Sequence, residues 1–102
     1  MTNKQRDKYL KRKYDISLVE YKAILNQQGG VCGVCSRKPK RGVNLAVDHV
    51  HDVLRRGRRA CVNGLVCSYC NRFLIAKNTT ISAYAVARFL HIRPARAVLD
   101  VR

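Results

Sequence analysis

The sequence is poor in acidic residues, in tryptophan and in long apolar runs. Only 6 of its 102 residues are Asp or Glu, against 21 Lys and Arg, and it contains no Trp. No stretch approaches the roughly 20 consecutive apolar residues of a membrane-spanning helix, and the N-terminus lacks the apolar segment of a signal peptide. These absences argue against membrane and secreted proteins, so we expect the chain to act in a reducing cytoplasm.

Length and aromatic content also limit the core. No internal repeat divides the chain, and its length fits a single domain over 1–102. Aromatic residues make up 7% of the sequence, so a domain of this size has few large side chains for its interior. We therefore expect some additional means of stabilisation.

The net charge of +15 is distributed along the chain. Basic clusters lie at 4–13, 37–41 and 55–59. Distributed positive charge on a folded domain is typical of proteins that bind a polyanion, and counterion release favours nucleic acid over a small acidic substrate. A basic surface that is merely solvated is the alternative. Membrane-surface binding is disfavoured, because no helix combines a Lys/Arg face with a Trp, Phe or Leu face.

Two capping boxes mark helices near the N-terminus. Thr2 and Gln5 form the first box, at the start of a helix expected over 3–13. The segment SLVE at 17–20 forms the second, and Gly29–Gly30 end the helix that it begins. One face of the first helix is basic and is expected to contact phosphates. Its side chains are Lys4, Lys8, Lys11 and Arg12.

The middle of the chain predicts a hairpin followed by a helix. Apolar residues alternate over 45–48, and residues 60–67 have the character of a second strand. A helix is expected over 68–77. Gly57 marks a turn among arginines that are further candidates for phosphate contacts. These are Arg55, Arg56, Arg58 and Arg59.

Residues 80–91 predict a helix with apolar residues on two sides. Such a short helix is either packed inside its own domain, which we favour slightly, or shared with a second subunit. Pro94 can begin a last short helix.

Four of the five cysteines form two C-x-x-C pairs, Cys32/Cys35 and Cys67/Cys70, separated by 31 residues. In a reducing compartment an odd cysteine count indicates metal binding rather than disulfides. Four thiolates form the tetrahedral shell of a structural Zn²⁺ site, which would supply the missing stabilisation. Unrelated buried pairs and an Fe–S cluster are alternatives, although nothing else suggests electron transfer. We assign the remaining Cys61 to packing.

The segment AVDHVH at 46–51 contains Asp48, His49 and His51. A carboxylate near bound phosphates would repel them, so Asp48 either neutralises a nearby arginine or binds a hard cation. With an oxygen of Asn71, directly after the second cysteine pair, Asp48 could hold Mg²⁺ or Mn²⁺. His49 beside that ion could take a proton from a water attacking phosphorus. A structural role is the usual alternative for a single histidine.

With these motifs in this order, the sequence resembles the His-Me finger (ββα-metal, HNH-type) nucleases, and within them the phage recombination endonuclease VII group. The resemblance covers about residues 14–78 and is carried by the segments at 14–35, 45–51 and 63–71. It implies a small α+β fold, a zinc-braced ββα-metal finger with flanking helices. The basic helix at 1–13 would precede this core, and the helices at 79–102 would follow it in a single nuclease domain.

The resemblance also implies roles for individual residues. The metal-binding Asp and Asn of the family match Asp48 and Asn71, and its general base matches His49. His51 matches the second histidine, which would orient phosphate or the base. The zinc ligands match Cys32, Cys35, Cys67 and Cys70. Leu74 departs from the pattern, because the best-known member has an acidic residue there. The chain also ends before that member's C-terminal extension, so cleavage is implied more directly than junction preference.

The implied activity is a divalent-metal-dependent DNA endonuclease that hydrolyses phosphodiester bonds at branched DNA such as Holliday junctions. Zn²⁺ would be structural, Mg²⁺ or Mn²⁺ catalytic, and two copies could form a homodimer. A phage protein of this kind would act in the host cytoplasm. The alternatives are a non-catalytic zinc-stabilised nucleic-acid-binding module and an enzyme that nicks DNA without regard to branching.

Overall fold

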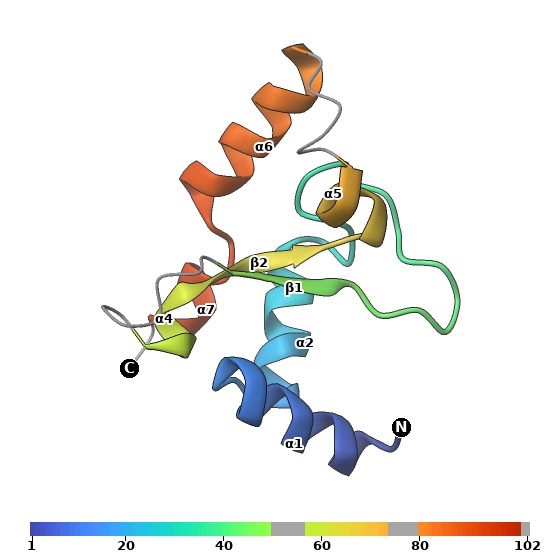
Figure 1. Cartoon of the computed structure of the whole chain (residues 1–102), viewed down its shortest axis with the longest axis vertical. Helices are drawn as coiled ribbons and strands as arrows, with labels where there is room; N and C mark the ends of the chain where they lie inside the picture. Colours follow the sequence, from blue (N-terminus) through green and yellow to red (C-terminus); the bar gives the residue numbers. More distant parts are fainter. Residues whose placement is uncertain (50–56, 74–79, 101–102) are drawn as a thin grey trace.

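The structure is built around a two-stranded antiparallel sheet, β1 paired with β2. This computed structural model describes residues 1–49, 57–73 and 80–100. Its elements are α1 (Asn3–Tyr14), α2 (Leu18–Gln27), β1 (Ala46–His49), α4 (Arg58–Cys61), β2 (Val62–Val66), α5 (Ser68–Phe73), α6 (Thr80–Ile92) and α7 (Arg96–Leu99). Helices α1 and α2 lie on one side of the hairpin and α6 lies on the other (Figure 1). The prediction of a small α+β fold is confirmed.

Both N-terminal helices begin at the predicted capping boxes, and α2 ends before Gly29–Gly30 as predicted, whereas α1 runs one residue beyond the predicted 13. Each starts at a capping box, in which the side chain of Thr2 or Ser17 accepts the N–H three residues later and the reciprocal bond is also made. Asp15 ends α1 in the left-handed conformation, with a φ of 59°. Gly29 and Gly30 follow α2 with φ of 75° and 77°, a region that glycine enters without a Cβ clash. Local hydrogen bonding therefore determines where both helices start and stop.

Helix α2 anchors the hairpin. The Tyr21 hydroxyl donates to the carbonyl of Leu45, just before β1, at 2.6 Å. The Gln28 amide, just after α2, accepts the Leu65 N–H at 2.8 Å and donates to the Leu65 carbonyl at 2.9 Å. The apolar core includes several side chains that are almost completely buried. These are Leu10, Ile16, Ile24, Val62 and Leu65.

The segment before β2 differs from the prediction. The sequence predicts a strand over 60–67, but the first two of these residues belong to the helical turn α4, and the strand follows them. Guanidinium groups of the C-terminal segment bind the carbonyls of this turn. Arg93 donates to the Ala60 carbonyl and Arg96 to the Arg59 carbonyl, both at 3.0 Å. These donors come from a distant part of the chain, so the local pattern could not reveal the turn.

The later helices follow the predicted order. The helix expected over 68–77 is confirmed as far as Phe73, since residues 74–79 lie outside the described residues. The helix expected over 80–91 is α6, and the short helix after Pro94 is α7. Within the described ranges, no helix has the length and apolar character needed to cross a bilayer.

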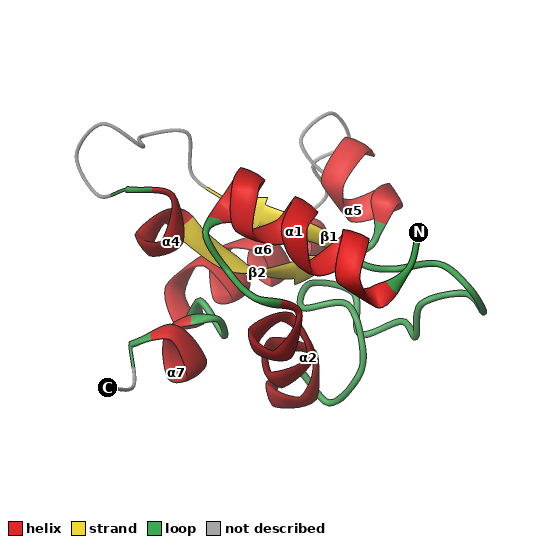
Figure 2. Ribbon diagram, turned by 90° about the horizontal axis from the view of Figure 1, so that it is seen from below, coloured by secondary structure: helices red, strands yellow, loops and turns green. Residues whose placement is uncertain are grey.

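Helix α6 is not packed inside the domain, so the interpretation favoured from the sequence is wrong. Phe89 is 4% exposed, whereas Tyr84, Leu90 and Ile92 are 73%, 45% and 54% exposed. Figure 1 shows α6 extending away from the hairpin. In the view from below, α1 lies in front of the hairpin and α6 behind it (Figure 2). A two-stranded hairpin is too narrow to cover both sides of this helix.

Candidate metal centre and active site

The cysteine pairs come together in one cluster. Cys32 and Cys35 lie in the loop after α2, Cys67 follows β2, and Cys70 lies in α5. Their sulfurs lie within 4.8 Å of one another, and the Sγ atoms of Cys35 and Cys67 are 3.8 Å apart. Zinc–sulfur bonds of about 2.3 Å in a tetrahedron require sulfurs about 3.8 Å apart. The cluster thus has the ligands and spacing for zinc, while Cys61 is buried outside it, as predicted.

Backbone N–H groups point at these sulfurs. Cys32 Sγ accepts from the N–H of Val34 at 3.4 Å and of Cys67 at 3.3 Å. Burial raises the pKa of the Cys32 thiol, but backbone hydrogen bonds from Cys35, Cys67 and Val34 outweigh this effect and lower the pKa to about 7. Burial raises the pKa of the Cys35 and Cys70 thiols. A divalent cation at the centre would offset the repulsion among four thiolates.

Phe89 holds α6 against the cysteine loop and the hairpin. A Cβ atom on Gly33 would lie 2.5 Å from the Phe89 ring, and one on Gly64 would lie 2.9 Å from it. The N–H of Gly33 also donates to the Leu65 carbonyl at 3.0 Å. Only residues without a side chain allow this approach, which brings the first cysteine loop, the hairpin and α6 together.

Asp48 and Asn71 line the same cavity. This cavity has a volume of about 190 Å³, and Asp48 enters it from β1 while Asn71 enters it from α5. Cys70 also lines it, so the cavity adjoins the cysteine cluster, and Phe89 and Leu90 line it from α6. A carboxylate and an amide oxygen with room for water are ligands that Mg²⁺ and Mn²⁺ accept. The fold thus brings the two predicted oxygen ligands together.

His49 directly follows Asp48 in the sequence but is not among the residues that line this cavity. Its imidazole packs edge-on against the Tyr14 ring, with centroids 5.2 Å apart. The pairing of the strands is irregular between Asp48 and His49. Such irregularities change the direction of side chains that would otherwise alternate strictly along a strand.

The candidate phosphate-binding residues fall into three groups. Lys4, Lys8, Lys11 and Arg12 are exposed on α1, where Lys11 also pairs with Asp7 at 3.0 Å. Arg58 and Arg59 have partners within the protein. The Arg58 guanidinium donates to the Arg12 carbonyl, and Arg59 forms a two-pronged ion pair with Glu20. Arg55, Arg56 and His51 lie outside the described residues.

Sequence reasoning missed Asn63. Its side chain is 2% exposed, and its Nδ2 donates to Asp48 Oδ2 at 3.1 Å. The sequence signal was a single amide among the apolar residues and glycine of VNGLV, and the structure buries all five. A polar side chain at such a position requires hydrogen-bond partners, and one of them is the proposed metal ligand.

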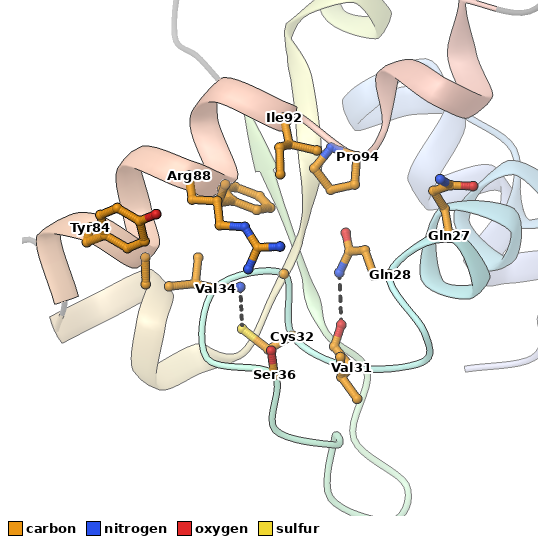
Figure 3. A pocket seen from close by; sticks show the side chains of 13 residues that line it. Gln27, Gln28, Val31, Cys32, Val34, Ser36, Tyr84, Arg88, Ile92 and Pro94 are labelled. Atoms are coloured by element: carbon orange, nitrogen blue, oxygen red, sulfur yellow. Dashed lines mark hydrogen bonds between the residues drawn. The ribbon is translucent and has the colours of Figure 1, made fainter. Parts of the chain in front are cut away.

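A second cavity, of about 310 Å³, lies between the first cysteine loop and α6. Figure 3 shows Tyr84, Arg88 and Ile92 on its helix side, facing Val34 and Ser36 of the loop. Apart from the zinc-type ligand Cys32, it contains none of the predicted site residues. The cavity shared by Asp48 and Asn71 is therefore the better candidate for chemistry.

The chain is similar to one protein family and to two mycobacteriophage proteins. A family model described as recombination endonuclease VII matches residues 7–91. The Gene 59 protein of Mycobacterium phage D29 is 37% identical over 62 residues, which are 61% of this chain and 34% of that protein. The Gene 59 protein of Mycobacterium phage L5 is 36% identical over 62 residues, with the same coverage. The chain thus spans about a third of the length of these curated relatives. No solved structure matches it significantly.

Proposed function

Because the chain belongs to the recombination endonuclease VII family, we propose that it is a divalent-metal-dependent DNA endonuclease that hydrolyses phosphodiester bonds. The main support is the cavity that Asp48 and Asn71 share beside the cysteine cluster. The net charge of +15 suits a nucleic-acid substrate. Zinc in the cluster would hold α5 against the hairpin and so keep Asn71 near Asp48.

In this proposal Asp48 and Asn71 hold Mg²⁺ or Mn²⁺. When bound, the cation supplies Lewis-acid polarisation of the phosphoryl oxygen and stabilises charge on the leaving oxygen. His49 accepts the proton of the attacking water, and Tyr14 restricts the orientation of its imidazole. His51 orients the phosphate or the base.

The exposed lysines and arginine of α1 are proposed to bind DNA phosphates. Phosphate contacts position a protein without reading the base sequence, so they suit an enzyme that recognises DNA shape. Arg55 and Arg56 remain proposed contacts. Arg58 and Arg59 are less suitable than predicted, because both bind groups within the protein.

We further propose that the substrate is branched DNA, such as a four-way junction. Two active sites in a symmetric homodimer could cut two strands of such a junction. The exposed apolar side chains of α6 offer a surface against which a second copy could pack.

The test compares cleavage of supercoiled plasmid, a four-way junction and linear duplex by zinc-loaded protein, with Mg²⁺, Mn²⁺ or chelator. We expect metal-dependent cleavage with a preference for the junction. His49→Ala should retain DNA binding and lose most cleavage. Asn26→Ala is the control, because Asn26 is exposed on α2, away from the proposed site and the proposed dimer surface.

Cleavage that His49→Ala leaves intact would exclude His49 as the general base. Equal cleavage of junction and linear duplex would indicate a nicking enzyme without junction preference. The second candidate function is a non-catalytic zinc-stabilised nucleic-acid-binding module, favoured by the absence of His49 from the lining of the Asp48 cavity. DNA binding without cleavage under any divalent metal would establish that module.

A further inference from the structure

Asn63 occupies a β-bulge in the hairpin. The strand register pairs Asp48 with Gly64 and His49 with Val62, so Asn63 is the extra residue of β2. Its carbonyl accepts the N–H of Ala95, in the turn before α7, at 3.0 Å. The bulge therefore connects the hairpin to the C-terminal segment at the level of the proposed metal ligand.

The buried Asn63 amide is bonded at both ends. Arg93 Nε donates to Asn63 Oδ1 at 2.7 Å, and Asn63 Nδ2 donates to Asp48 Oδ2 at 3.1 Å. Arg93 has a φ of 46°, which residues with side chains rarely adopt, and its N–H donates to the Phe89 carbonyl at 2.7 Å. The guanidinium is thus fixed by its backbone and by the Ala60 carbonyl as well as by Asn63.

We infer that Asn63 is a positioning residue that orients the Asp48 carboxylate for its divalent cation, with Arg93 fixing the amide from behind. This role rests on the proposed function. Each ligating carboxylate in a metal site is typically held by a hydrogen bond from a neighbouring group. The bond from Asn63 occupies one of about four acceptor positions on the carboxylate and leaves the others for the cation.

The amide also separates two charges. A guanidinium in direct contact with Asp48 would form an ion pair that competes with the cation for the carboxylate. Through the amide, Arg93 strengthens the N–H donor and fixes its direction without placing its own charge against the carboxylate. The neutral Asn63 amide can therefore hold the Asp48 carboxylate in place and still permit metal binding.

The test measures Mn²⁺ binding to zinc-loaded protein by electron paramagnetic resonance of the free ion. Asn63→Leu is close to isosteric and removes the bond to Asp48. Gln28→Leu is the control, because the Gln28 amide binds the same hairpin at Leu65 and has no hydrogen bond to Asp48. We expect Asn63→Leu to raise the Kd for Mn²⁺ by about 10- to 100-fold. Gln28→Leu should change this Kd by less than about 3-fold, because it removes no contact with Asp48.

Zinc content and thermal unfolding report whether each variant is folded. If Asn63→Leu does not fold, Arg93→Met provides the test, since it removes the guanidinium and leaves Asn63 in place, and a several-fold rise in Kd is expected. Asp48→Asn separates this inference from the proposed function. Wild-type Mn²⁺ binding that Asp48→Asn does not reduce overturns both the metal site and the role of Asn63. Binding that depends on Asp48 but is unchanged in the folded Asn63 or Arg93 variant overturns the positioning role alone.

Discussion

The imidazole of His49 packs edge-on against the Tyr14 ring, with ring planes inclined at 64°. Tyr14 is the last residue of α1 and His49 the last residue of β1, so the contact links the basic helix to the hairpin beside the proposed metal ligands. A base held in one orientation loses less freedom in the transition state than a mobile one.

Tyr14→Leu should therefore lower kcat for DNA cleavage by about 10-fold, the scale of a small misplacement of a catalytic group. Tyr14→Phe keeps the ring and should retain most activity. Single-turnover cleavage, together with DNA-binding titrations, separates the chemical step from affinity. Equal losses in both variants would show that the ring contact does not orient His49.

Zinc should be required for the fold. Structural zinc contributes on the order of 10 kcal/mol in small domains, so chelation or Cys67→Ser should abolish cooperative unfolding. Cys61→Ala should keep one zinc per chain and lose about 1–2 kcal/mol, because Cys61 is buried outside the cluster. Metal analysis and circular dichroism measure both effects. Loss of zinc from Cys61→Ala would place Cys61 among the ligands.

The ion pair between Glu20 and Arg59 should make stability depend on acid pH. The hydrogen bond from Arg59 lowers the pKa of Glu20 from 4.5 to about 2 in the folded chain. The stabilisation is thus complete above pH 4.5 and is lost as the pH falls toward 2. After allowance for partial exposure, it amounts to about 2 kcal/mol.

Urea unfolding of wild type and Glu20→Gln at a series of pH values measures this dependence. Glutamine keeps an acceptor for the capping box and removes the charge. Zinc release at low pH affects both proteins, so the difference between them is the informative quantity. If the two proteins differ in free energy of unfolding by the same amount from pH 6 to about pH 3, the pairing of Glu20 with Arg59 is contradicted, because the stabilisation from that pair should fall within this pH range.

The basic face of α1 should determine part of the salt dependence of DNA binding. Each phosphate contact adds about 0.9 to the slope of log affinity against log salt concentration. Lys4→Gln and Lys8→Gln together should therefore reduce the slope by about 2. Lys22→Gln, an exposed lysine of α2, is the control for net charge. An equal effect per charge in all variants would indicate that binding follows total charge rather than this face.

The candidate site was predictable from sequence where neighbouring residues determine it. Each C-x-x-C turn places two thiols within four residues, so the cluster needed only the two turns to meet. Asn71 directly follows Cys70, so the meeting of the two turns also brings it toward the hairpin and Asp48. The partners of Arg59 and the bonds of Asn63 were not predictable, because Glu20 and Arg93 are remote from them in the chain.

The sequence alone determined the starts of α1 and α2, the end of α2 and the members of the cysteine cluster, since capping boxes, a glycine pair and C-x-x-C turns each act within a few residues. Tertiary structure decided the α4 turn, the exposure of α6 and the bulge that joins Asn63 to Asp48. Those features depend on hydrogen bonds from residues distant in the chain and on how much surface a two-stranded hairpin can cover. The local spacing of residues reveals neither.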